Sequence, residues 1–78
     1  MIDPSLFKNL LKVIDENSDE NGFCYLKSEE IGKKIFYSAP YINVLLKELR
    51  EWNVISVEYF KQPKRYNLTR KIKIIGEI

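Results

Sequence analysis

Histidine is absent from this 78-residue chain, and cysteine occurs once, at Cys24. Without an imidazole there is no histidine general base, no Ser-His or Cys-His nucleophile pair and no histidine ligand for zinc. A single thiol forms no disulfide within the chain and does not complete a structural zinc site. The three glycines, Gly22, Gly32 and Gly76, lie too far apart to form a phosphate-binding loop. The sequence therefore predicts no enzyme activity, no metal and no cofactor.

The chain also lacks an apolar run of the roughly 18 residues that a membrane span needs. Its first four residues lack the basic and apolar regions of a signal peptide. Because small domains without disulfides are typical of reducing compartments, we expect a cytoplasmic protein with no membrane partner. The length allows one domain over residues 1–78, and a hydrophobic share of 45% is enough for a small core, expected in about residues 4–69.

Charge is unevenly distributed, although the net charge is only +2. Residues 1–22 carry two basic and five acidic side chains, net −3, and residues 23–53 carry five and four, net +1. Residues 54–78 carry six basic and two acidic side chains, net +4. A basic C-terminal third is typical of a surface that binds a polyanion. Lysines that keep a solvated face soluble explain the same distribution equally well.

Apolar residues recur at helical spacing in two segments. The first helix is expected to begin at Asp3, as N-cap, and Pro4, and to end near residues 15–17. The second of these helices is expected to begin at Ser38, as N-cap, and to run to Trp52. The two apolar stripes consist of Leu6, Phe7, Leu10, Leu11 and Ile14, and of Ile42, Leu45, Leu46, Leu49 and Trp52. We expect both stripes to lie in the core.

Shorter elements are expected between these two helices. Residues 15–22 are polar and end in glycine, which favours a loop, and residues 23–26 favour a short strand. Ser28 is expected to be the N-cap of a short helix that ends at residues 36–37.

The C-terminal third predicts a β-hairpin with a basic tip. Residues 54–60 are rich in β-branched and aromatic side chains, residues 61–64 favour a turn, and residues 65–69 alternate like a returning strand. Asn53, just before the hairpin, tolerates the left-handed conformation at a helix end. Residues 70–78 fit a strand and a short helix equally well.

Residues 28–47 resemble the twenty-residue helix-turn-helix of transcription regulators. Its apolar positions are matched by Ile31, Ile35, Ile42 and Leu45. Gly32 matches the small residue at the point where the two helices cross. Phe36 departs from the pattern, because the turn position is often glycine, and this leaves the angle between the helices open.

The resemblance continues beyond this motif and covers roughly residues 5–69. Residues 46–55 are similar to the recognition helix and strand entry of winged-helix regulators of the MarR and PadR kind, and residues 65–69 resemble their second wing strand. The composition also resembles the compact winged-helix proteins of archaeal viruses and plasmids, which would place the protein in the host cytoplasm. The resemblance implies an α+β winged helix-turn-helix, with three helices and a small antiparallel sheet, that binds double-stranded DNA sequence-specifically and regulates transcription.

Expected DNA contacts follow from the major groove, which admits an α-helix and presents base edges. The N-terminal half of the third helix is expected to meet the bases, with Asn43 suited to adenine, Lys47 to guanine and Val44 to a thymine methyl. The expected base contacts are Ala39, Pro40, Tyr41, Asn43, Val44 and Lys47. The expected backbone contacts are Lys33, Lys34, Tyr37, Ser38, Lys61, Lys64 and Arg65.

Several of these residues also have purely structural explanations. Ser38 caps the third helix whether or not its amides bind an anion. Lys33 and Lys34 interact favourably with the dipole at the end of the second helix. Tyr37 and Tyr41 are equally suited to half-buried packing.

A homodimer is expected, because a single small module buries only about 600–1,000 Å² on DNA and two-fold symmetry doubles the contacts. The expected dimer contact consists of Leu6, Leu10, Ile72, Ile74, Ile75 and Ile78. Packing of these isoleucines against the first helix of the same chain is the alternative.

The main alternative function is a winged-helix protein-interaction module without direct DNA binding, which Glu48 and Glu51 favour because acids oppose phosphate. No small-molecule substrate is expected in so short a chain.

Overall fold

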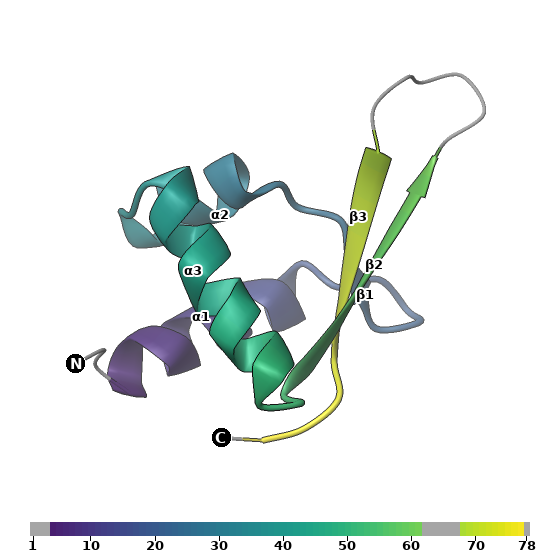
Figure 1. Cartoon of the computed structure of the whole chain (residues 1–78), viewed down its shortest axis with the longest axis horizontal. Coiled ribbons are helices and arrows are strands. Elements are labelled where there is room, and N and C mark those ends of the chain that lie inside the picture. The colour runs from purple at the N-terminus through teal and green to yellow at the C-terminus, as the bar shows by residue number, and fades with distance from the viewer. Residues whose placement is uncertain (1–3, 62–67, 78) are drawn as a thin grey trace.

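The computed structural model describes residues 4–61 and 68–77, and in this part of the chain three helices and a three-stranded antiparallel sheet form an α+β fold (Figure 1). In chain order the elements are α1 (Pro4–Glu16), β1 (Phe23–Cys24), α2 (Ser28–Ile35), α3 (Ala39–Glu51), β2 (Ile55–Lys61) and β3 (Leu68–Ile74). This order and these element types are compatible with a winged helix.

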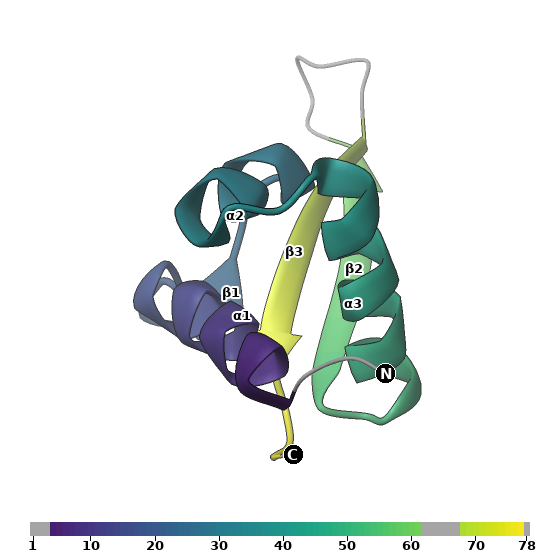
Figure 2. The same cartoon turned by 90° about the vertical axis from the view of Figure 1, so that its left-hand side faces the viewer.

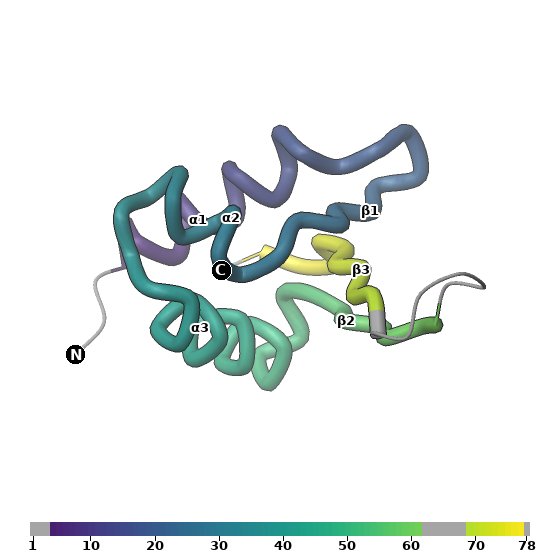
Figure 3. Tube along the Cα trace, turned by 90° about the horizontal axis from the view of Figure 1, so that it is seen from above, coloured from purple at the N-terminus to yellow at the C-terminus, as the bar shows by residue number. Residues whose placement is uncertain are grey.

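β3 is the central strand of the sheet, in the order β1-β3-β2. Its Lys73 is paired with Phe23 of β1 on one side and with Ser56 of β2 on the other. The expected strand at residues 23–26 is shorter than predicted, because only its first two residues pair with β3. Seen from above, the helices lie on one side of the sheet, and α3 runs beside β2 (Figures 2 and 3).

The core lies between the helices and the helix-facing side of the sheet. Its buried members are Leu6, Phe7, Leu10, Ile14, Cys24, Ile31, Ile42, Leu45, Leu46, Leu49, Val54, Ile55 and Ile72. Both predicted stripes are thereby confirmed except at Trp52, with Leu11 half-buried. The prediction for Trp52 is wrong: its side chain is 52% exposed, although its ring packs against Phe7 with centroids 5.1 Å apart. Trp52 lies just after the last residue of α3, where the helical stripe ends.

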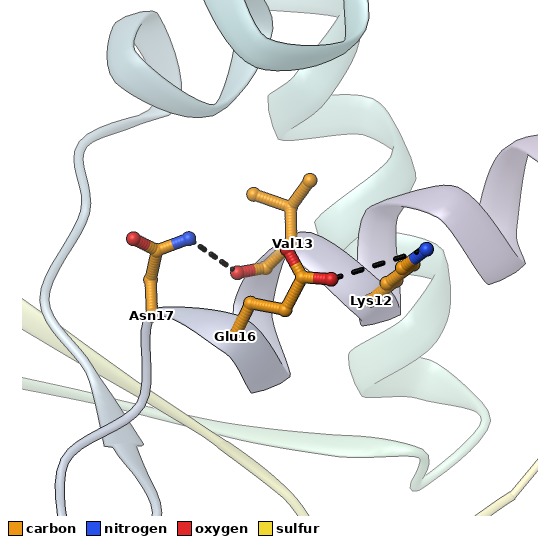
Figure 4. Close-up of polar contacts among 4 residues, drawn as sticks. All are labelled: Lys12, Val13, Glu16 and Asn17. Carbon is orange, nitrogen blue, oxygen red and sulfur yellow. Dashed lines mark hydrogen bonds and ion pairs between the residues drawn. The ribbon is translucent and has the colours of Figure 1, made fainter.

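The end of α1 lies within the predicted range and is closed by a side chain (Figure 4). The Asn17 side-chain amide donates a hydrogen bond of 2.8 Å to the Val13 carbonyl, which also accepts the Asn17 backbone N–H at 3.2 Å. Lys12 and Glu16 form an exposed ion pair at 3.9 Å one turn apart. The expected N-cap Asp3 lies outside the described residues.

Ser28 is not the N-cap of α2, contrary to the prediction, because it is already helical. Lys27 takes the cap position, and its backbone N–H donates to Glu30 Oε1 at 3.1 Å. Ser38 is the N-cap of α3 as predicted, but its hydroxyl makes no capping hydrogen bond. Asn53 has a φ of 59°, which confirms the left-handed conformation expected after α3.

The turn between α2 and α3 is very tight at Gly32. A Cβ at this position would lie 2.2 Å from the Tyr37 carbonyl oxygen and 3.6 Å from Cγ1 of Ile42. Phe36, in the turn itself, has a φ of 65° and an exposed fraction of 91%. An aromatic residue therefore occupies the left-handed position that glycine most readily adopts.

The hairpin strands β2 and β3 pair from Ile55 with Ile74 to Lys61 with Leu68. The predicted turn at residues 61–64 and returning strand at 65–69 fall largely outside the described residues. β3 continues to Ile74, so residues 70–74 form a strand and not a short helix. The expected core limit at residue 69 is therefore wrong, because Ile72 is fully buried in the centre of the sheet.

Candidate nucleic-acid interface

The outer face of α3 is exposed to solvent, as the helical spacing predicted. Pro40, Asn43 and Lys47 are exposed, and Val44 is 48% exposed. Ala39 and Tyr41 are half-buried, and Tyr41 packs against the core. Four of the six expected base contacts thus lie on an open helix face.

A cleft of about 250 Å³ separates this face from the sheet. It is lined by Asn43, Leu46, Lys47, Arg50, Val57, Tyr59 and Arg70. Lys47 and Arg50 come from α3, and Arg70 comes from β3. No carboxylate is among the lining residues in the described part of the chain. A polyanion that enters the cleft therefore meets three cations and no opposing charge.

Strand alternation turns Arg70 toward this cleft. Ile72 is buried against the helices, and Arg70, two residues earlier on β3, lies on the same face of the sheet. The paired residues on β2 are Val57 opposite Ile72 and Tyr59 opposite Arg70. The helix-facing side of the sheet is therefore apolar near the core and polar toward the hairpin end.

Arg70 connects three parts of the fold by hydrogen bonds. Its Nη2 donates to the Leu26 carbonyl and its Nη1 to Ser28 Oγ, both at 3.0 Å. The Ser28 hydroxyl in turn donates a short hydrogen bond to Asn43 Oδ1. Burial lowers the pKa of Arg70, and the neighbouring Tyr59 phenol partly offsets this. The guanidinium remains charged at neutral pH, because its ordinary pKa is far above 7.

The expected backbone contacts are divided between different surfaces. Tyr37 and Ser38 lie at the N-terminus of α3, where Tyr37 is 44% exposed and its ring is 5.2 Å from that of Tyr41. Lys33 and Lys34 are exposed in the last turn of α2, and Lys34 lines a separate groove beside α1. The structure therefore does not bring Lys34 to the cleft.

Of the three expected wing contacts, Lys61, Lys64 and Arg65, one lies within the described residues. Lys61 is exposed at the end of β2, and the strand alternation places it on the same face as Tyr59. Lys64 and Arg65 lie outside the described residues.

The expected dimer contact needs correction. Leu10 and Ile72 have no exposed surface, and Leu6 is only 8% exposed, because all three pack in the core of the single chain. Ile74 is half-buried against the same core, which leaves Ile75, at 55% exposed, as an accessible member of the predicted set. Ile78 lies outside the described residues.

Sequence reasoning missed Arg50, Tyr59 and Arg70 as residues that line the cleft, and it missed Ser28 as the hydrogen-bond link between Arg70 and Asn43. A signal for Arg50 was present, because it follows Lys47 by three residues and therefore shares its helix face. No comparable signal existed for Arg70, because its direction depends on β3 extending past residue 69.

Comparisons with protein-family models, curated proteins and solved structures find no match to this chain. Within residues 4–61 and 68–77, no helix is long and apolar enough to cross a membrane. Function is therefore inferred from the geometry of α3 and the cleft.

Proposed function

We propose that this chain is a sequence-specific, double-stranded DNA-binding transcription regulator with a winged helix-turn-helix fold. The observation that supports this most strongly is the basic cleft, which is lined by Lys47 and Arg50 of α3 and by Arg70 of β3. α3 enters the major groove, whose width of about 12 Å admits an α-helix. The β2–β3 hairpin contacts the DNA backbone or the minor groove beside it.

Phosphates and bases are contacted by two sets of residues in this proposal, which share Lys47. The cleft cations and Lys61 neutralise phosphates, and these contacts set affinity and register. Asn43, Val44 and Lys47 lie on the exposed face of α3 and contact base edges. Lys47 belongs to both groups, because it lines the cleft and lies on that face.

The acidic residues of α3 do not oppose this arrangement. Glu48 is half-buried and Glu51 is the last residue of the helix. Neither of them lines the basic cleft.

We further infer that the regulator acts as a homodimer. Two exposed apolar side chains, Trp52 and Ile75, remain for a dimer contact, and the Ile75 N–H donates a 2.8 Å hydrogen bond to the carbonyl of Val54, two residues after Trp52. These two residues replace the buried residues of the original expectation. Sedimentation of the wild type and of Trp52→Ser tests it. We expect a wild-type dimer of two 9.3 kDa chains and a monomeric variant; a wild-type monomer at micromolar concentration contradicts the dimer.

One observation favours a protein-interaction module as the second candidate. The Phe36 ring is 91% exposed beside a groove lined in part by Val13 and Ile35. Exposed aromatic rings are enriched at protein interfaces. Such a module would bind its partner without the steep salt dependence of DNA binding.

A salt titration distinguishes the two candidates. Binding of a fluorescent 20-base-pair duplex is measured for the wild type, for Lys47→Ala/Arg50→Ala, and for the charge-matched control Lys8→Ala/Lys12→Ala on α1. Each lost phosphate contact lowers the slope of log K against log salt by about 0.9, so the first variant is expected to lose a slope of about 2 and at least about tenfold in affinity. The control should stay within about twofold of the wild type. Equal losses in both variants, or no duplex binding by the wild type at low salt, would contradict the proposal.

A further inference from the structure

The side-chain amide of Asn43 is already partly engaged within the protein. Its Oδ1 accepts the hydrogen bond from Ser28 Oγ. Its Nδ2 makes no hydrogen bond to any residue in the described part of the chain. The two halves of the amide therefore differ: the acceptor has a protein partner and the two N–H donors remain open.

The direction of this hydrogen-bond chain follows from Arg70. A guanidinium only donates hydrogen bonds, so Ser28 Oγ must accept from Arg70 Nη1. The single Ser28 proton is then available for Asn43, and it needs an acceptor there, which is Oδ1. Arg70 is itself half-buried and donates to the Leu26 carbonyl, so the guanidinium that begins this series of hydrogen bonds has a defined position.

An asparagine with both amide groups open matches adenine, which offers the N6 donor and the N7 acceptor. Guanine offers two acceptors, N7 and O6, at the same edge. A side chain whose oxygen already accepts one hydrogen bond and whose amino group is open matches the guanine edge better. At guanine both N–H groups find acceptors, whereas at adenine one N–H is left without an acceptor and the oxygen must accept a second hydrogen bond.

We propose that Arg70 and Ser28 are positioning residues that orient Asn43 as a hydrogen-bond donor in the major groove, so that it selects guanine over adenine. This inference rests on the proposed DNA-binding function. It differs from the sequence-based expectation that Asn43 suits adenine, because it takes account of a partner from α2 and a partner from β3. Base recognition by α3 is thereby coupled to the strand that carries the hairpin.

The test is a selection of bound sequences from duplexes with 20 randomised base pairs. It is run in parallel with the wild type, Asn43→Ala, Ser28→Ala and the control Ser56→Ala, whose serine lies on β2 and faces away from the core residue Ile55.

The wild type is expected to prefer guanine over adenine by about tenfold at the position where Asn43→Ala loses its base preference. Ser28→Ala is expected to weaken the preference at that same position by about threefold or more. Its affinity for unselected duplex should stay within about twofold, because phosphate contacts are retained. Ser56→Ala should match the wild type.

Folding and side-chain order are checked separately. Thermal unfolding identifies any variant that is not folded, and the ¹⁵N–¹H signals of the Asn43 amide report its order in the absence of DNA. Dispersed amide signals in the wild type that move toward free-asparagine positions in Ser28→Ala support the inference, as does restored discrimination in Ser28→Thr, which keeps the hydroxyl.

Two results overturn the inference while leaving the proposed function intact. One is adenine at the position that Asn43→Ala relaxes, and the other is unchanged discrimination in a folded Ser28→Ala variant. If the wild type enriches no sequence and binds no duplex, the proposed function is wrong and the positioning role is wrong with it.

Discussion

Phe36 offers a sharp test of the turn between α2 and α3. Its φ of 65° places a non-glycine residue in the left-handed region, which costs about 1–2 kcal/mol relative to an ordinary helical conformation. Its ring is 91% exposed, so removing it changes little buried area. We therefore compare Phe36→Gly with Phe36→Ala, because both variants lack the ring and only the backbone preference differs.

The expected difference follows from two opposing terms. Glycine relieves the left-handed strain of about 1–2 kcal/mol, and it loses about 0.4–1 kcal/mol through the greater freedom of the unfolded chain. Phe36→Gly should therefore be more stable than Phe36→Ala by about 0.5–1 kcal/mol. For a domain of this size, that corresponds to a Tm higher by about 2–8 °C.

The assay is thermal and urea unfolding, with Lys8 as the matched position. Lys8 is exposed within α1, in ordinary helical conformation, so Lys8→Gly should be less stable than Lys8→Ala by about 1 kcal/mol. The sign of the glycine–alanine difference is thus expected to reverse between the two positions. If alanine is as stable as glycine at position 36, the left-handed strain is absent and the reasoning about the turn is refuted.

Three further predictions concern stability. Gly32→Ala is expected to cost more than about 2 kcal/mol in urea unfolding, because its Cβ would lie 2.2 Å from the Tyr37 carbonyl oxygen; a loss below about 0.5 kcal/mol would mean that the turn relaxes freely. Burial raises the pKa of the Cys24 thiol above its ordinary value of 9.0, so the unfolded chain loses this proton first and stability should fall as pH rises above 9. Subtracting the pH profile of Cys24→Ala isolates this contribution, and identical profiles would rule it out. Glu58→Gln removes the 3.3 Å ion pair between exposed Glu58 and half-buried Lys71 and should cost less than about 1 kcal/mol, with the difference disappearing at about 1 M salt; a larger, salt-insensitive loss would point to a packing role.

Local sequence patterns were sufficient to predict α1 and α3 and the face of each helix that is buried. The spacing of Leu10 and Ile14, and of Leu45 and Leu49, places each pair on one helix face, and burial of that face does not depend on which partner covers it. Asn53 was likewise predictable, because few side chains tolerate its backbone conformation. The same spacing failed for Trp52, since α3 ends one residue earlier and the ring lies at the edge of the core.

The structure of residues 70–74 was not predictable in this way. Within residues 70–78, Ile72 and Ile74 alternate with lysines as in a strand, but Ile72, Ile75 and Ile78 recur at helical spacing. The outcome depended on pairing with β1 and β2, and the pairing of Phe23 with Lys73 joins residues 50 positions apart. Pairing over such a distance leaves no periodic signal within either segment.

By itself, the sequence determined which helix faces are buried, where α3 begins, and that Asn43 and Lys47 share an open face, because these properties arise from residues within a few positions of one another. Only the tertiary structure decided that Arg70 completes the basic cleft and reaches Asn43 through Ser28. The physical reason is that a hydrogen bond between β3 and α2 depends on the packing of the whole sheet against the helices, and no short stretch of sequence contains both partners.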